Sequence, residues 1–438
     1  MNIAARYNGE IINGDAMQLY EGLPVITNKM PVEERQNVPH HLLGEIGLNE
    51  QTWTVSTFVS HALQKIEDIR SRGRLPILVG GTHYYTQSLL FHDALAEEED
   101  SAESESSNQW PILKAPTEEV LAKLREVDPV MADRWHPNDH RKIRRSLEIW
   151  LQTGRKASDI YEEQRARREN STIAEETDDL DATSYLRTRT LVLWVNAGLE
   201  ELSTRLASRV DKMLSLGLLD EVRMLEDFAR EEAASGHAVD MTRGIWVAIG
   251  YKEFLDYQTA LRKGVSSDEL SKILDEAIER TKISTRQYAK RQVRWIRIKL
   301  THAVNAAGAK DKFFMLDGSD LSAWDRVVSE VGLNLVDAFL QERPLPDPLT
   351  ISPLAAEMLQ PKRHDMSARA DLWSRRHCDI CNMTAVTESD WTQHMKSRRH
   401  RICSRKAKLT ANDGVHPKPY NKTAQEADVK DNATTKNE

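Results

Sequence analysis

The sequence predicts an α/β protein that carries a helical insertion and a small metal-binding module. Short apolar strands alternate with helices in the first 92 residues, and the same alternation resumes near residue 190. A helical pattern lies between two polar stretches, and every cysteine falls between residues 378 and 403. Of the 438 residues, 40% are hydrophobic and 29% are charged, which is enough apolar material for a packed core. The length exceeds that of one ordinary domain, so a multidomain protein is expected.

The first expected strand is Glu10-Ile11-Ile12, and it runs into a turn at Asn13-Gly14-Asp15. Residues 58–69 have the apolar spacing of a helix. A second strand, Leu75 to Val79, ends in the turn Gly80-Gly81-Thr82. Strands bounded by such turns and separated by a helix are typical of an α/β sheet.

Beyond this part of the sheet, the composition changes several times. The acidic, serine-rich run 97–107 predicts a solvated loop, and residues 117–168 predict a helical insertion. After a polar stretch, the apolar run 190–195 predicts a return to the buried sheet, and helices dominate 199–300. The predicted domains are core 1–96, loop and insertion 97–188, core and helical region 189–345, linker 346–372, zinc finger 373–405 and disordered tail 406–438.

The charge and cysteine content restrict the partners and the compartment. The chain has 60 basic and 68 acidic residues, a net charge of −8, so a nucleic acid must be bound by a local basic patch. Three clustered cysteines cannot cross-link the bulk of the chain, which favours a reducing compartment. No apolar run approaches the roughly 18 to 20 residues that cross a membrane, and no signal peptide follows Met1. We therefore expect neither secretion nor membrane insertion.

The sharpest local pattern is a pair of cysteines followed by a pair of histidines. The spacing Cys378-x2-Cys381-x12-His394-x5-His400 is that of a tetrahedral structural zinc site. Zinc binding would supply folding energy that so short a segment cannot obtain from its own core. Cys403 lies outside the pattern and is interpreted as a bystander. The basic end of the finger resembles fingers that bind structured RNA, although solubility or nuclear import are alternative roles for it.

Two other patterns are ambiguous when each is considered alone. Residues 282–299 hold seven basic residues and no acid, so this helix either reads a phosphate backbone or presents a solvated face. Asp15 follows a strand, where α/β proteins place catalytic groups, but an aspartate in such a turn also hydrogen-bonds to its own backbone. Gly80-Gly81-Thr82 is either an anion cradle or a tight turn.

The combination of motifs, in order along the chain, is more specific than any one of them. The motifs are Asn8-Gly9-Glu10-Ile11-Ile12, Asp15-Ala16-Met17-Gln18-Leu19-Tyr20, Thr27-Asn28-Lys29, Val38-Pro39-His40-His41-Leu42, Leu78-Val79-Gly80-Gly81-Thr82, Asn138-Asp139 with Arg141-Lys142-Ile143-Arg144-Arg145, Ile249-Gly250-Tyr251-Lys252-Glu253 and Gln287-Tyr288-Ala289-Lys290-Arg291-Gln292. Together they resemble the tRNA dimethylallyltransferase (tRNA isopentenyltransferase) family in its eukaryotic form, and the resemblance extends from Ile3 to His400.

The resemblance implies a fold and a reaction. The fold would be a P-loop NTPase-like parallel sheet core with a helical insertion domain. The reaction would transfer a dimethylallyl group from dimethylallyl diphosphate to the exocyclic amine of the adenine 3′ of the anticodon. Asp15 would be the general base and Arg209 would meet the diphosphate, together with Mg²⁺. Structural Zn²⁺ would occupy the finger. The residues that match positions of the family binding tRNA or diphosphate are Gln18, Thr82, Arg141, Lys142, Arg144, Arg145, Arg205, Lys290, Arg291, Gln292 and Arg297.

The sequence departs from the family pattern in one respect. The family opens with a strand and a Gly-rich phosphate loop that ends in Gly-Lys-Ser or Gly-Lys-Thr, and neither tripeptide occurs in these 438 residues. We therefore expect the first strand and the loop to be missing, and the chain as given to transfer no prenyl group. A catalytically inactive tRNA-binding protein and an adenylate isopentenyltransferase are the alternative functions. The expected protein is a monomer of the cytosol, with the mitochondrion and nucleus as further compartments.

Overall fold

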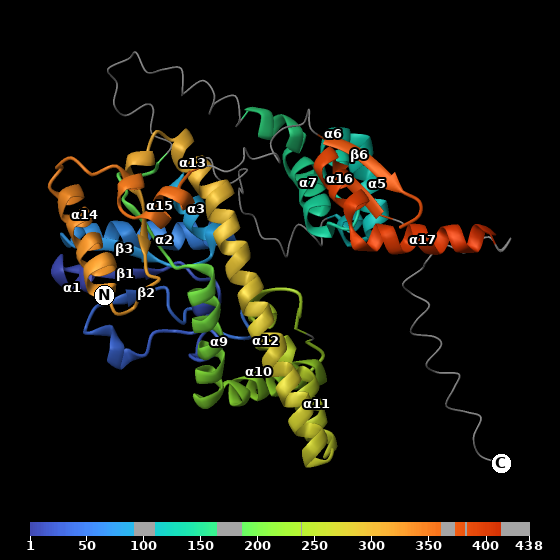
Figure 1. Ribbon diagram of the computed structural model, residues 1–438, viewed down its shortest axis with the longest axis horizontal. Helices are drawn as coiled ribbons and strands as arrows, with labels where there is room; N and C mark the ends of the chain where they lie inside the picture. The colour runs from blue at the N-terminus through green and yellow to red at the C-terminus, as the bar shows by residue number, and fades with distance from the viewer. Residues whose placement is uncertain (92–109, 164–185, 238, 361–372, 382, 413–438) are drawn as a thin grey trace. The chain divides into compact units, whose positions relative to one another are not determined.

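The computed structural model describes residues 1–91, 110–163, 186–237, 239–360, 373–381 and 383–412 (Figure 1). The chain divides into two compact units. Unit 1 contains residues 1–100 and 168–364, and unit 2 contains residues 101–167 and 365–438. The predicted loop at 97–107 and most of the polar stretch before residue 188 lie outside the described residues.

A parallel sheet forms the first part of unit 1. Its three strands, β2 (His40–His41), β1 (Gly9–Asn13) and β3 (Leu75–Val79), are ordered β2-β1-β3. In the central strand Ile11 pairs with Ile77 on one side and with His40 on the other. All five residues of β1 are buried, as expected for a strand covered on both faces. The two strands predicted from the sequence are therefore confirmed, and they are parallel.

A second parallel pair joins β4 (Val192–Asn196) to β5 (Phe313–Asp317). β4 was predicted, but β5 was not identified from the sequence. Among the described residues, no hydrogen-bonded ladder connects this pair to the three-stranded sheet. Val79 on β3 and Val195 on β4 are 53% and 50% exposed, respectively, an unusual state for valines in strands of a parallel α/β core.

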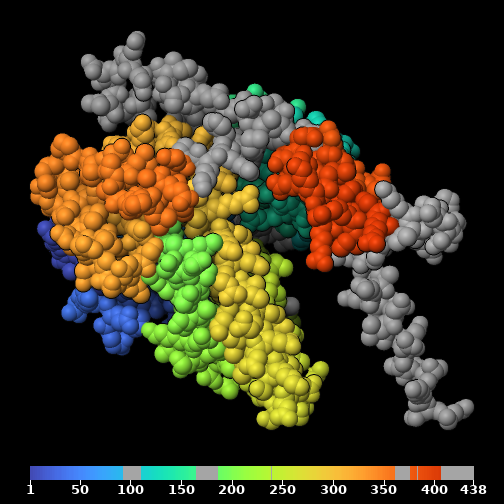
Figure 2. All heavy atoms as spheres, viewed as in Figure 1, coloured from blue at the N-terminus to red at the C-terminus, as the bar shows by residue number. Residues whose placement is uncertain are grey.

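Helices cover the strands of unit 1. The main apolar core joins Ile12 of β1 to Phe58 and Ala62 and includes the fully buried Tyr251 and Phe254. Helices α9 and α12 run side by side (Figures 1 and 2). The helices of unit 1 are α1 (Asn2–Arg6), α2 (Val55–Ser71), α3 (His83–Leu90), α9 (Leu199–Ser215), α10 (Leu218–Ala234), α11 (Leu255–Lys263), α12 (Ser267–Trp295), α13 (Thr301–Ala306), α14 (Val331–Leu340) and α15 (Pro353–Met358).

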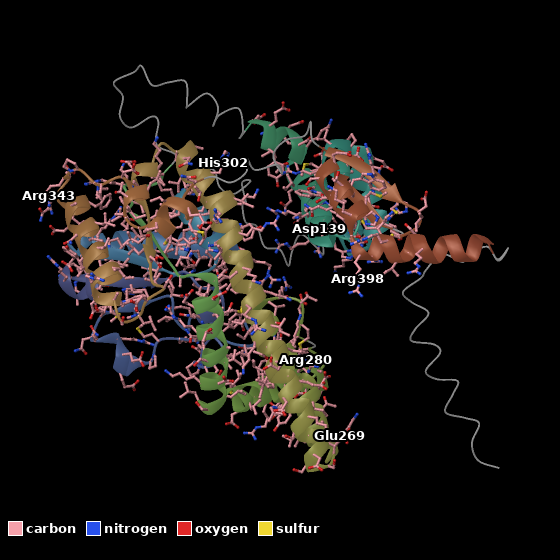
Figure 3. All side chains as sticks on the ribbon, in the orientation of Figure 1. Asp139, Glu269, Arg280, His302, Arg343 and Arg398 are labelled. Carbon is pink, nitrogen blue, oxygen red and sulfur yellow. The ribbon has the colours of Figure 1, made fainter. Side chains whose placement is uncertain are left out.

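Short 3₁₀ and π segments connect or extend these helices. After Trp295, α12 continues as a π-helical turn over Ile296–Leu300. Glu269 and Arg280 project from α12 in Figure 3, and Glu269 lies in the first turn, where Ser266 caps the helix. The remaining segments are η1 (Met17–Leu19), η2 (Val32–Arg35), η4 (Gly244–Val247), η5 (Lys252–Phe254), η7 (Lys310–Lys312), η8 (Asp325–Glu330) and η9 (Pro348–Thr350).

Part of the segment predicted as a linker is folded. Within 346–372, helix α15 buries Ala355 and Met358 in the same apolar cluster as Phe313 of β5. The apolar residues Leu354, Ala355, Ala356, Met358 and Leu359 form too short a run to predict a helix in a proline-rich context. Helix α15 and Leu359 therefore pack into the core of unit 1, and 361–372 lie outside the described part.

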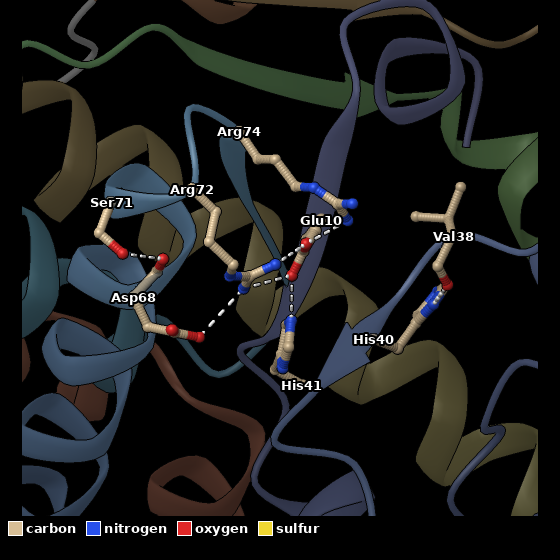
Figure 4. Close-up of polar contacts among 8 residues, drawn as sticks. All are labelled: Glu10, Val38, His40, His41, Asp68, Ser71, Arg72 and Arg74. Carbon is tan, nitrogen blue, oxygen red and sulfur yellow. Dashed lines mark hydrogen bonds and ion pairs between the residues drawn. The ribbon is translucent and has the colours of Figure 1, made fainter.

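An ion-pair cluster lies at the amino-terminal end of β1 (Figure 4). The Glu10 side chain is 1% exposed. Its carboxylate accepts hydrogen bonds from Arg72 and from Arg74, the latter at 2.6 Å, and it lies 2.6 Å from His41 Nε2. These contacts lower the pKa of Glu10 to about 2, with the Arg72 hydrogen bond as the largest cause. The cluster ties β1 to β2 and to the connection between α2 and β3.

Unit 2 contains the helical insertion and the finger. The insertion, with a core around Leu124, Met131 and Leu147, matches the helical pattern predicted from residue 117 onward. In the finger, an antiparallel hairpin precedes two helices. Within this unit the finger strand β6 approaches the insertion, and Arg375 lies 3.5 Å from Asp133. The elements are η3 (Pro111–Lys114), α5 (Thr117–Val127), α6 (Pro129–Arg134), α7 (His140–Thr153), β6 (Trp373–Cys378), β7 (Met383–Thr387), α16 (Glu388–Lys396) and α17 (Arg398–Asn412).

Helix α17 reaches Asn412, so the first seven residues of the predicted disordered tail are helical, and 413–438 lie outside the described residues. None of the described helices combines the length and apolar character needed to cross a bilayer.

Candidate functional site

Two turns meet at the carboxyl ends of β1 and β3. Gly14 donates its backbone N–H to Val79 O at 2.8 Å, and Thr82 donates its backbone N–H to Gly14 O at 3.2 Å. A Cβ on Gly80 would lie 2.2 Å from the carbonyl carbon of Gly14, so only glycine fits there. The Thr82 hydroxyl accepts the N–H of Ala16 at 2.9 Å. The Gly80-Gly81-Thr82 turn therefore supports the turn that carries Asp15.

Asp15 is held by its own turn. Its backbone N–H donates to Asn13 Oδ1 at 2.9 Å, and one of its carboxylate oxygens accepts the N–H of Met17 at the same distance. Burial raises the pKa of Asp15, and this effect is opposed by the Met17 N–H and by the charge of Arg209. A carboxylate with a raised pKa is a better proton acceptor than a solvated one. Asp15 is therefore a turn residue whose carboxylate also has a raised pKa, and its catalytic role stays a prediction.

The charge of Arg209, an exposed residue on helix α9, acts on Asp15. Partial desolvation lowers the pKa of Arg209, and the charge of Asp15 opposes the shift, so each group lies within the electrostatic reach of the other. Arg205 lies one turn earlier on the same helix, and its guanidinium donates to the carbonyls of Gly318, at 2.7 Å, and Ser319. Of the two arginines suggested by the sequence, Arg209 is therefore the one whose charge acts on Asp15, and Arg205 binds the loop after β5.

Helix α12 contacts the same turns. Gln292 donates its side-chain N–H to Gly81 O at 2.9 Å. Trp295 stacks on His83, with ring centroids 4.5 Å apart and an interplanar angle of 5°. Burial raises the pKa of Tyr288, and the charge of Asp15 adds to that shift. Positions 288, 292 and 295 share one helical face because they are separated by four and three residues. One face of α12 therefore lies along the candidate site.

Sequence reasoning missed two tyrosines near Asp15. Burial raises the pKa of Tyr85 above its usual range, and Asp15 is among the further causes, as it is for Tyr288. Both tyrosines lie beside residues that were selected, Thr82 and Gln292. The helical spacing from Tyr288 to Gln292 was a usable signal, whereas the position of Tyr85 depends on tertiary packing.

The predicted basic residues of α12 have different environments. Lys290, Arg291 and Arg294 are exposed, so their charges are available to a polyanion. Arg297 lies in the π-helical turn, and one of its guanidinium nitrogens donates to Glu357 O at 3.2 Å. Gln18, on the 3₁₀ turn Met17–Leu19, donates its side-chain N–H to Asn28 O at 3.2 Å.

In unit 2, the predicted basic residues lie on α7, which Asp139 caps (Figure 3). Arg141 and Arg144 are exposed. Lys142 pairs with Asp139 at 2.7 Å and lies 5.0 Å from the centre of the Trp135 ring, and Arg145 pairs with Glu148 at 3.1 Å. Two of the four cations are therefore engaged in contacts within the insertion.

The two cysteines and two histidines of the finger converge. One ligand atom from each of Cys378, Cys381, His394 and His400 lies within 4.8 Å of the others, and all four residues are buried. His400 Nδ1 is 3.6 Å from Cys378 Sγ, 3.4 Å from Cys381 Sγ and 3.1 Å from His394 Nε2. Zinc bonds of roughly 2.0 to 2.3 Å in a tetrahedron require spacings of this size. Two sulfurs and two imidazole nitrogens fit structural zinc.

Comparisons with known proteins agree with this architecture. The IPP transferase family model matches residues 18–299, and a zinc-finger model of C2H2 type matches residues 376–400. The chain is 35% identical to the tRNA dimethylallyltransferase of Saccharomyces cerevisiae over 92% of its own length and 87% of that protein. It is 30% identical to the tRNA dimethylallyltransferase of Homo sapiens, over 95% and 85% of the two chains.

A solved structure resembles the fold. It represents a eukaryotic dimethylallyltransferase acting on tRNA, and the match has a TM-score of 0.73 at 32% identity over 94% of each chain. The match therefore covers nearly the whole of both chains. The sequence identity of 32% is higher than a shared fold alone requires. This chain belongs to the tRNA dimethylallyltransferase family.

Proposed function

We propose that this protein transfers a dimethylallyl group from dimethylallyl diphosphate to the exocyclic amine of the adenine 3′ of the anticodon in tRNA. The placement of a partly buried Asp15 on the turn after β1, where the charge of Arg209 from α9 acts on it, carries the proposal. One group accepts a proton and the other binds an anion, which are the two tasks of this reaction. Membership of the family supplies the substrates.

In the proposed reaction a C–N bond forms as a C–O bond breaks. The adenine amine attacks the first carbon of the dimethylallyl group, and diphosphate leaves with the bonding electrons. The Asp15 carboxylate accepts the amine proton, and Arg209 meets the charge that develops on the diphosphate. Thr82 and Gln292 keep the two turns in register through Ala16 and Gly81. The target base must leave its stack to reach a carboxylate held in a partly buried turn.

Two metal ions are part of the proposal. Zn²⁺ would be held by Cys378, Cys381, His394 and His400 and would supply folding energy to the finger. Mg²⁺ would accompany the diphosphate oxygens. Among the described residues, the one cluster of at least three potential metal ligands is that of the finger.

The exposed cations are assigned to contacts with the phosphate backbone of tRNA. Lys290, Arg291 and Arg294 on α12 and Arg141 and Arg144 on α7 offer charge without a described ion pair. Phosphate contacts of this kind add affinity and orientation and carry no sequence information. The monomeric state and the expected compartments, cytosol with mitochondrion and nucleus, stay predictions.

Transfer from radiolabelled dimethylallyl diphosphate to unmodified tRNA tests the function. Label on tRNA supports the proposal, and label on AMP would favour an adenylate isopentenyltransferase. A second version, extended ahead of Met1 by roughly 20 to 30 residues with a strand and a Gly-rich loop ending in Gly-Lys-Thr, tests the expected need for a phosphate loop. Transfer by the extended version alone would support both ideas. Tight tRNA binding without transfer by either version would identify an inactive tRNA-binding protein.

A further inference from the structure

The motif Thr27-Asn28-Lys29 has no role in the site described above. It closes a loop that begins where the Asp15 turn ends, at Tyr20. The Lys29 ammonium is partly buried and donates to the carbonyls of Tyr20 and Gly22. A single cation that bridges two backbone oxygens seven and nine residues away fixes the start of the loop relative to its end.

Two further contacts hold the same loop. Both carboxylate oxygens of Glu221, from helix α10, accept backbone N–H groups, one from Val25 at 2.9 Å and the other from Ile26 at 2.7 Å. The Thr27 hydroxyl donates to Leu23 O at 2.7 Å. Leu23 has a φ of +51°, a left-handed conformation that costs a non-glycine residue on the order of 1 kcal/mol or more. Such a loop persists only when side chains hold it.

The loop is linked to the turn of the candidate base. Asp15 accepts the N–H of Met17, which starts the 3₁₀ turn Met17–Leu19, and Tyr20 follows that turn directly. Gln18 donates its side-chain N–H to Asn28 O, beside Lys29. A displacement of the Tyr20 carbonyl would therefore move the carboxyl end of the Asp15–Tyr20 turn. A displacement of the Asn28 carbonyl would break its hydrogen bond with the Gln18 side chain.

We propose that Lys29 is a positioning residue for the reaction, holding the Asp15–Tyr20 turn and Gln18 through the carbonyls of Tyr20 and Gly22. The inference rests on the proposed function, because it assigns the turn to the target adenine. Lys29 does not reach the reacting atoms in this role. Its contribution is to the geometry of Asp15, where a displacement of about 1 Å can cost on the order of 100-fold in rate.

The environment of Lys29 provides a test that simple unfolding would not mimic. Burial lowers the pKa of Lys29 to about 8, with Glu221 on α10 and Glu21 opposing the shift and Arg35 on η2 adding to it. The ammonium is therefore lost at moderately alkaline pH. An arginine at this position would stay charged, because its guanidinium is protonated throughout this range.

The experiment compares Lys29→Met and Lys29→Arg with the unchanged protein, and Lys263→Met serves as a matched control at an exposed lysine on α11. Single-turnover transfer to tRNA is measured from pH 6.5 to 10, together with KM for dimethylallyl diphosphate. We expect Lys29→Met to slow transfer about 10-fold or more with KM changed less than about 3-fold. Lys29→Arg should stay within about 3-fold of the unchanged protein, and its alkaline decline should move to higher pH. The control should match the unchanged protein.

A second measurement does not depend on turnover. Hydrogen exchange of the peptide covering residues 20–29 should become faster in Lys29→Met and stay unchanged in Lys29→Arg and Lys263→Met. If the unchanged protein transfers nothing, the same substitutions are compared in the extended version. If that version also transfers nothing, the proposed function fails, and exchange alone decides the inference about Lys29. Equal transfer rates and equal exchange in Lys29→Met and the unchanged protein would overturn it. An alkaline decline at the same pH in Lys29→Arg and the unchanged protein would also do so.

Discussion

Replacing Glu10 by glutamine removes the charge at the centre of the cluster in Figure 4 and keeps its shape. The Glu10 pKa of about 2 in the folded protein, against 4.5 for an unperturbed glutamate, corresponds to about 3 kcal/mol of stability at neutral pH. Arg72 and Arg74 are 40% and 36% exposed, and solvent screening reduces that figure to about 2 kcal/mol. We expect Glu10→Gln to lose about 2 kcal/mol at pH 7.

The pH dependence gives the sharper test of this reasoning. A carboxylate whose pKa is depressed by folding contributes stability above its unfolded pKa and loses it as pH falls through its folded pKa. The difference between Glu10→Gln and the unchanged protein should therefore be constant above about pH 5 and shrink between pH 4.5 and about 2. Urea unfolding at pH 7, 5.5, 4 and 3, followed by circular dichroism, measures it.

Asp68 offers a matched control for Glu10. It pairs with the same Arg72 at 3.0 Å, but its side chain is 53% exposed. Asp68→Asn should cost less than about 1 kcal/mol, because exposed ion pairs contribute little. An equal loss in both variants, or a Glu10→Gln effect that is the same at pH 7 and pH 3, would refute the assignment of stability to the buried carboxylate.

Four other predictions follow from the sites. In the version extended ahead of Met1, Asp15→Asn should lower single-turnover transfer about 100-fold or more, with tRNA affinity within a few-fold. Without the substitution, transfer by that version should fall as acid protonates Asp15 through its raised pKa. Near-normal turnover in Asp15→Asn would make Asp15 only a turn residue. Cys381→Ser should abolish stoichiometric zinc in metal analysis, and unchanged metal content would contradict the zinc site. Gly80→Ala should destabilise unit 1 by more than about 2 kcal/mol, because its Cβ overlaps Gly14; an unchanged urea midpoint would argue against this close approach. Arg294→Ala should weaken tRNA binding and reduce the slope of log affinity against log salt by about 1, and Arg205→Ala, whose guanidinium binds Gly318, should leave that slope unchanged.

Much of the fold could be predicted from local signals. The alternation of strand, helix and turn located β1 and β3, and the two glycines after β3 marked the turn that supports Asp15. β5 was missed because Phe313 to Leu316 is a short apolar run that periodicity cannot distinguish from a buried helix. The pairing of β4 with β5 bridges more than a hundred residues and carries no local signature.

The sequence predicted which residues form the site better than it predicted how those residues are arranged in space. Ligand spacing alone identified the four finger residues, because zinc imposes its own distances. Only the family resemblance favoured Arg209 over Arg205 for the diphosphate, because the two arginines lie one turn apart on one helix and the contact of Arg205 with Gly318 depends on tertiary packing. The contact of Lys29 with Tyr20 and Gly22 depends on a left-handed loop that no motif announces.

The discontinuity of unit 1 has a consequence for synthesis on the ribosome. Residues 1–100 emerge first, but the rest of their unit, residues 168–364, emerges only after the insertion has been made. Phe58 and Ile12 share their core with Leu218, Val222 and Ala277, so the nascent sheet waits for helices α10 and α12. During that interval, which at about 5 to 20 residues per second lasts several seconds or more, its apolar face is available to chaperones and to other nascent chains. The insertion core around Leu124 uses only residues 110–161 and can fold during the same wait.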